Sequence, residues 1–184
     1  MAIKTLFTAT TVTLALALPA AATTVSDTQV LTSRGQDLFF SFAGLGASDG
    51  TGGTLTLIGD TLDLGVASSE YMDVSIEGTS YGRWICDSTP SNGGTDIPGR
   101  SGNTFCSFTL PITLAGVDLD GFLADGTVNI SAVMGSGVDP FGSSNNLTAR
   151  LEYTDAVAAV PLPAGGLLLL TGLAGVAGLR RRRK

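Results

Sequence analysis

The sequence has no histidine among its 184 residues. Hydrolases of the serine or cysteine triad type use an imidazole as general base, so this absence excludes that machinery. Paired carboxylates such as Asp118 and Asp120, or Asp60 and Asp63, remain as an acid and a base. Each of them lies beside glycine or in a short polar connector, where aspartate commonly caps a turn. We therefore expect a protein that is not an enzyme and has no catalytic residues.

Positive charge is scarce between the two ends of the chain. All 16 acidic residues lie in the stretch from Asp27 to Asp155, where only four of the 10 basic residues are found. The other basic residues are Lys4 and the five that close the sequence at 180–184. A surface with this acidic excess repels the phosphates of nucleic acids. A nucleic-acid partner is therefore excluded.

Residues 1–22 have the composition of a secretory leader. Lys4 provides a positive start, residues 6–18 form an apolar run interrupted only by threonine, and small residues lead up to Ala22. A helix over 6–18 would be roughly 20 Å long, which is short of the ~30 Å hydrocarbon core of a bilayer. We predict a signal peptide that passes through the export machinery and is cut by signal peptidase between Ala22 and Thr23.

Residues 23–155 show no sustained helical periodicity and alternate apolar with polar side chains instead. A period of two is typical of half-buried strands. The alternation is clearest at residues 38–43, 54–57, 71–77, 128–134 and 147–153. Many short strands without helices to cover a parallel sheet predict an all-β domain over 23–155, a single antiparallel β-sandwich of jelly-roll or immunoglobulin-like type.

Dipeptides that favour tight turns separate these runs. Glycine adopts positive φ without steric cost, which hairpin turns require. The dipeptides are Asp49–Gly50, Glu77–Gly78, Asp120–Gly121 and Asp125–Gly126. Because Asp125–Gly126 lies between residues 117–124 and 127–134, we predict that these two segments pair as an antiparallel hairpin.

Two cysteines, Cys86 and Cys106, fall on the predicted buried sides of their strands, next to Trp84 and Phe108 respectively. An exported chain meets an oxidising compartment, and the glycines and prolines between the two cysteines let them approach each other. With no histidine to complete a zinc site or to activate a thiolate, we predict a disulfide. Closing a loop of about twenty residues stabilises a fold by about 3 kcal/mol.

Calcium binding is an open hypothesis for this acidic domain. Asp118-Leu119-Asp120-Gly121 resembles the start of an oxygen-ligand loop, and Asp125 is a further carboxylate close in sequence. The EF-hand pattern is incomplete because Thr127 stands where that motif has glutamate. The calcium hypothesis therefore rests on Asp118, Asp120 and Asp125, and no other cofactor is expected.

Polysaccharide binding is a second open hypothesis. Sandwich modules that hold sugars present aromatic rings, and the rings available here are those of Tyr71, Tyr81 and Trp84. Trp84 shares a face with Cys86, which favours packing in the core. Tyr71 lies opposite the apolar face of residues 72–76, so Tyr71 and Tyr81 are predicted to be the better exposed pair.

The carboxyl-terminal residues combine three features in a fixed order. A motif with two prolines is followed by an uncharged segment and then by a basic end. The motif is Val160, Pro161, Leu162, Pro163 and Ala164, and the basic end is Arg180, Arg181, Arg182, Arg183 and Lys184. Proline excludes helix and holds the motif extended, so a membrane helix begins after it. A helix over 164–179 would be roughly 24 Å long, a marginal span, with the basic tail 180–184 in the cytoplasm.

This order resembles the VPLPA variant of the PEP-CTERM family of bacterial protein-sorting signals. Leu162 stands at the centre, where the name-giving motif has glutamate between its prolines. The resemblance covers residues 160–184 and implies that the protein is held in the inner membrane with its domain outside. It also implies cleavage near the motif by an exosortase-like transpeptidase, often in bacteria that make extracellular polysaccharide.

Together these features predict a bacterial surface or extracellular-matrix protein with a structural or adhesive role, for which exopolysaccharide is a candidate partner. Its parts are the leader at 1–22, the domain at 23–155, a linker with the sorting motif at 156–163, the membrane helix at 164–179 and the basic tail. Two alternatives stay open: a carbohydrate- or calcium-binding module, and a single-pass membrane protein that keeps its tail as a permanent anchor.

Overall fold

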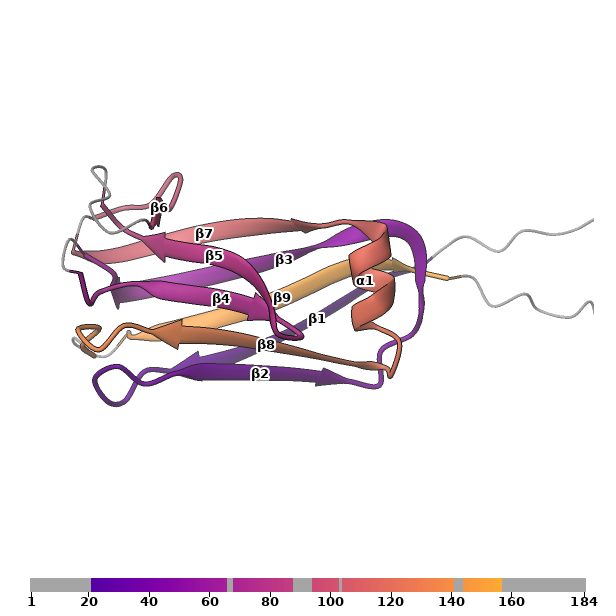
Figure 1. Ribbon diagram of the computed structural model, residues 1–184, viewed down its shortest axis with the longest axis horizontal. Coiled ribbons are helices and arrows are strands. Elements are labelled where there is room, and N and C mark those ends of the chain that lie inside the picture. Colours follow the sequence, from indigo (N-terminus) through magenta and orange to yellow (C-terminus); the bar gives the residue numbers. More distant parts are fainter. Residues whose placement is uncertain (1–20, 66–67, 88–93, 103, 141–143, 157–184) are drawn as a thin grey trace, which may run out of the picture.

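A computed structural model of the protein describes residues 21–65, 68–87, 94–102, 104–140 and 144–156. These residues form two sheets packed face to face, with a short helix at one end (Figure 1). Residues 1–20 of the predicted signal peptide, the predicted sorting motif and membrane helix, and the basic tail lie outside the described residues. Within the part that is described, no helix is long and apolar enough to cross a bilayer.

The two sheets contain four and five strands. The four-stranded sheet has the order β1 (Ala22–Val30), β9 (Asn146–Asp155), β3 (Ser48–Asp63), β7 (Phe105–Leu114). The five-stranded sheet has the order β2 (Leu38–Ala43), β8 (Thr127–Met134), β4 (Met72–Ile76), β5 (Thr79–Ile85), β6 (Thr95–Asp96). Their pairings are antiparallel except for the short parallel pair of β5 with β6. The predicted all-β sandwich is confirmed.

The core lies between the sheets and is filled by the side chains that the alternation assigned to the buried side. In β2, Leu38, Phe40 and Phe42 are buried while the residues between them are exposed. Strands β4, β8 and β9 repeat this pattern along their lengths. Both inner faces remove apolar surface from contact with water when the sheets pack together. This layer is therefore the main stabilising feature of the domain.

The hairpin predicted for residues 117–124 and 127–134 is wrong. Helix α1 (Gly116–Phe122) occupies the first segment, so Asp120–Gly121 lies within a helix, and β8 pairs with β2 and β4 instead. Leu119 and Leu123 are four residues apart and both buried, which is the spacing of one helical face. The helix packs on β3 and covers the core at that end of the sandwich (Figure 1).

Two of the predicted turns adopt the expected backbone. Glu77 and Gly78 join β4 to β5 with φ values of 48° and 76°. At the end of α1, Gly126 has φ of 75° and the Asp125 carboxylate accepts a hydrogen bond of 2.9 Å from the Thr127 N–H. This turn leads from the helix into β8, whereas Asp49–Gly50 lies in the irregular first part of β3.

The predicted disulfide between Cys86 and Cys106 is confirmed, with 6.4 Å between the two Cα atoms. Cys86 follows β5 of one sheet and Cys106 belongs to β7 of the other, and both side chains are fully buried. The bond therefore joins the two sheets directly. We call this end of the sandwich the disulfide pole.

The first and last described residues lie side by side at the opposite end, next to α1 (Figure 1). Ala22 pairs with Thr154 across β1 and β9, and the Asp155 N–H donates to the Ala21 carbonyl at 2.9 Å. Both ends of the domain thus point in one direction. We call this end the terminal pole.

Candidate binding face on the five-stranded sheet

A shallow hollow of about 330 Å³ lies on the outer face of the five-stranded sheet, between β2, β8 and the β4–β5 turn. We call it the sheet-face hollow. Its lining is Phe39, Phe40, Ser41, Ser75, Glu77, Gly78, Asn129, Ile130 and Ser131. The exposed members are one aromatic ring surrounded by hydroxyl, carboxamide and carboxylate groups, a combination that suits a ligand with both apolar and hydroxylated faces.

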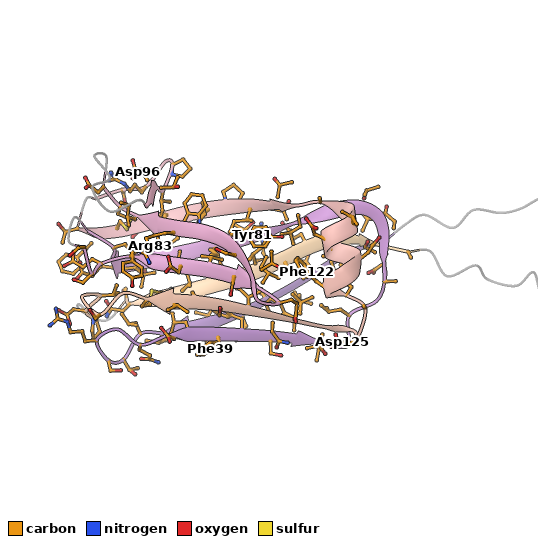
Figure 2. The ribbon with its side chains drawn as sticks, viewed as in Figure 1. Phe39, Tyr81, Arg83, Asp96, Phe122 and Asp125 are labelled. Carbon is orange, nitrogen blue, oxygen red and sulfur yellow. A yellow bond between two sulfur atoms is a disulfide. The ribbon has the colours of Figure 1, made fainter. Side chains whose placement is uncertain are left out.

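Phe39 is placed outside by the alternation of β2. Its neighbour Phe40 points inward and is 1% exposed, whereas Phe39 is 64% exposed. Figure 2 labels Phe39 on β2. Phe39 pairs with Ser131 on β8, so its position is fixed by a paired strand and not by a loop. Sequence reasoning missed this residue, although an aromatic ring on the polar side of an alternating strand was a readable signal.

The polar side of the hollow is organised around Glu77 and Asn129. Glu77 Oε1 accepts hydrogen bonds from the Asn129 N–H at 2.6 Å and from Asn129 Nδ2 at 3.1 Å. In return the Glu77 N–H donates to the Asn129 carbonyl at 3.0 Å. These three bonds hold the left-handed backbone of Glu77, a conformation that costs energy for a residue other than glycine. The amide and carboxylate are therefore held in a fixed arrangement before any ligand arrives.

Hydroxyl groups continue the hollow toward the middle of the sheet. Ser75 and Ser131 face each other across β4 and β8, and their hydroxyl oxygens are 2.7 Å apart. Beside them, Arg83 makes two hydrogen bonds of 2.8 Å with Asp73. The sheet thus presents side chains that already bond to one another, so little side-chain freedom remains to be lost when a ligand binds.

The three aromatic residues predicted to contact glycan lie elsewhere, on β5 and immediately before β4. The Arg83 guanidinium lies over the Tyr71 ring, 3.6 Å from its centroid, so one face of that ring is covered. Tyr81 and Trp84 pack against the core, and burial raises the pKa of the Tyr81 hydroxyl. None of the three lines the sheet-face hollow. Phe39 is the more accessible ring.

The three aspartates proposed for calcium have separate local roles. Asp118 is in the first turn of α1, Asp125 caps the turn before β8, and Asp120 accepts a hydrogen bond from the Ser48 hydroxyl. Asp120 and Ser48 line a second hollow, of about 310 Å³, at the terminal pole. Among the described residues, no group of three or more Asp, Glu, His or Cys side chains is close enough to hold a metal ion.

Asp63 is a buried carboxylate at the disulfide pole. It is 5% exposed, and its Oδ2 accepts a hydrogen bond of 3.4 Å from the Asp139 N–H. Its Oδ1 has no hydrogen-bond partner among the described residues. Burial, and then the charge of Glu70, raises the pKa of this carboxyl above its ordinary value. Asp60, its candidate partner in acid–base chemistry, accepts hydrogen bonds from Thr61 and Ser107 at the bulge of β3.

The raised pKa of Asp63 predicts an unusual pH dependence of stability. The pKa of Asp63 is about 3.9 in the unfolded state and higher in the folded state. Between these two values the folded state binds more protons than the unfolded state. The free energy of unfolding therefore falls as pH rises through this range. We expect Asp63→Asn to be more stabilising at pH 7 than at pH 3, measured by urea unfolding. Asp49→Asn is the control, because hydrogen bonds from Thr51 lower the pKa of Asp49 and its effect has the opposite sign. Equal pH dependence for both variants would contradict the assignment.

Comparison with known proteins adds no further residue roles. No family model matches the sequence, and none of the curated proteins matches it. The site is therefore interpreted from its own geometry.

Proposed function

We propose that this chain is an exported, non-enzymatic surface or matrix protein whose sandwich, of jelly-roll or immunoglobulin-like type, holds polysaccharide in the sheet-face hollow. The observation that carries the proposal is the exposed ring of Phe39 beside the bonded pair of Glu77 and Asn129. Sugar rings offer apolar C–H faces to an aromatic ring and hydroxyls to amide and carboxylate groups.

The position of the two ends of the domain supports tethering. Because Ala22 and Thr154 pair at the terminal pole, the leader before the domain and the sorting segment after it attach at one end. A domain held there by a membrane segment extends its strands away from the bilayer. We propose that the tail holds the chain in the inner membrane until an exosortase-like enzyme cuts it near the motif at 160–164.

A glycan array probed with the full chain tests the binding proposal. We expect Phe39→Ala to weaken binding of a responsive glycan about two- to tenfold, because stacking on an aromatic ring contributes about 0.5–1.5 kcal/mol. Val117→Ala is the matched control, since Val117 is 79% exposed on α1, away from the hollow. Undiminished binding by the Phe39 variant would refute the site. Binding that requires calcium would favour the calcium-dependent alternative.

Mass spectrometry of the protein released from cells tests the sorting proposal. We expect a carboxyl terminus close to Pro163, because the two prolines present an open segment to a peptidase and the following helix is only marginally long. The amino terminus of the same sample is expected at Thr23. Protein that stays in the membrane and ends at Lys184 would show a permanent anchor instead.

A further inference from the structure

The outer edge of β1 is a regular, extended backbone edge with which another strand can pair. Within the described residues β1 pairs only with β9, and the register runs without a bulge from Ala22 to Val30. Natural sheets protect such edges with lysine, proline or bulges, because the unpaired N–H and C=O groups attract other strands. Between Ala22 and Val30 there is no lysine and no proline, and Asp27 is the only charged residue.

The backbone direction along this edge follows from the hydrogen bonds that flank β1. The Ala21 carbonyl accepts from Asp155, and the Leu31 N–H donates to the Asn145 carbonyl at 2.8 Å. Odd-numbered residues therefore face β9, and even-numbered residues direct their N–H and C=O groups to the open edge. In the chain that begins at Thr23, the open-edge residues are Thr24, Ser26, Thr28 and Val30. Of their N–H groups, that of Thr28 donates to the Asp27 carboxylate at 2.9 Å.

The edges of β7 and β6, at the far sides of the two sheets, are less suitable. The β7 strand contains Pro111, and Ser101 already pairs with Ser107 through two backbone hydrogen bonds of 3.0 and 3.1 Å. Strand β6 has only two residues. Strand β2 pairs only with β8 in the described part of the chain, but it spans six residues, against nine for β1. The proline and the additional backbone pairing that protect the edge of β7 have no counterpart on β1 within the described residues.

We propose that β1 pairs antiparallel with the β1 strand of a second copy of this chain, about a two-fold axis at Ser26. This register places each Ser26 opposite its symmetry mate and each Thr24 opposite the Thr28 of the other copy. Hydroxyl pairs of this kind favour antiparallel pairing, and Asp27 then faces Val25 instead of another acid. The two four-stranded sheets become one continuous sheet.

The two-fold axis also turns the terminal poles to opposite sides. Copies held in one membrane have their terminal poles facing the same bilayer and cannot form this contact. Released copies, or copies on two facing cells, can form it. This last step depends on the proposed tether, whereas the pairing itself does not.

Cross-linking of the exported full chain tests the proposed register. Opposed residues in a hydrogen-bonded antiparallel pair have Cα atoms about 5.5 Å apart, within the range that a disulfide spans. We expect Ser26→Cys to give a covalent dimer on a non-reducing gel. Thr109→Cys, at an exposed position on β7, is expected to stay monomeric. Equal cross-linking of both variants, or none at position 26, would overturn the proposal.

Charge exchange at the same position tests the contact without a covalent bond. Ser26→Glu places a carboxylate beside Arg150 within the chain, which protects the fold, but opposes two carboxylates across the two-fold axis. In sedimentation experiments on the full chain we expect at least tenfold weaker dimerisation for Ser26→Glu, and recovery when it is mixed with Ser26→Lys. Asp27→Ala frees the Thr28 N–H and is expected to strengthen the dimer. Failure of the mixture to recover would count against pairing through β1.

Phe39→Ala should dimerise normally, so loss of glycan binding is distinguishable from loss of pairing.

Discussion

Replacing Phe40 with alanine is expected to lower the free energy of unfolding by about 3–5 kcal/mol, the usual cost of deleting a buried phenylalanine ring. Phe40 is 1% exposed and belongs to the core cluster between the two sheets. Because small domains are stable by about 5–15 kcal/mol, this loss removes a large part of the total. Urea unfolding followed by circular dichroism measures it.

The adjacent residue provides the control for this experiment. Phe39→Ala is expected to change the free energy of unfolding by no more than about 0.5 kcal/mol, since Phe39 is 64% exposed. A shift of β2 by one residue would exchange the two rings between core and solvent. Equal losses for Phe39→Ala and Phe40→Ala would therefore contradict the register of β2 on β8. The Phe39 variant also separates binding from stability, because it is expected to lose glycan while its free energy of unfolding stays nearly unchanged.

Breaking the disulfide is expected to cost about 3 kcal/mol in the chain-entropy model, for a sequence separation of 20 residues. For a domain of this size the melting temperature should fall by about 10 °C. The bond also joins β7 to the end of β5, so its loss removes a direct connection between the sheets. Thermal melting with and without reductant measures the effect.

The double variant Cys86→Ala, Cys106→Ala is the control for the action of the reductant. It should melt at a lower temperature than the oxidised protein, and addition of reductant should not lower that temperature further. If the native protein carried two free thiols by mass spectrometry and melted at an unchanged temperature, the stabilising role of the bond would be wrong.

The sequence predicted two of the elements that form the sheet-face hollow, but it did not predict the hollow itself. Glu77–Gly78 was identified as a turn, and residues 128–134 as a strand, but nothing in the local pattern brings Glu77 next to Asn129. That contact joins residues 52 positions apart through the pairing of β4 with β8. The aromatic residues selected from the sequence turned out to be covered by Arg83 or packed on the core, because exposure depends on neighbours from other strands.

The sequence by itself predicted the strands around residues 38–43, 54–57, 71–77, 128–134 and 147–153, the sides of them that face the core and the pairing of Cys86 with Cys106, because alternation and an even cysteine count are local or compositional properties. It did not predict β1. Only the tertiary structure decided that residues 116–122 form a helix, since the alternation there is too short to exclude one and burial of Leu119 and Leu123 selects it. It also decided which strands lie at the edges. Edge position depends on long-range pairing, and among the described residues that pairing leaves one side of β1 open.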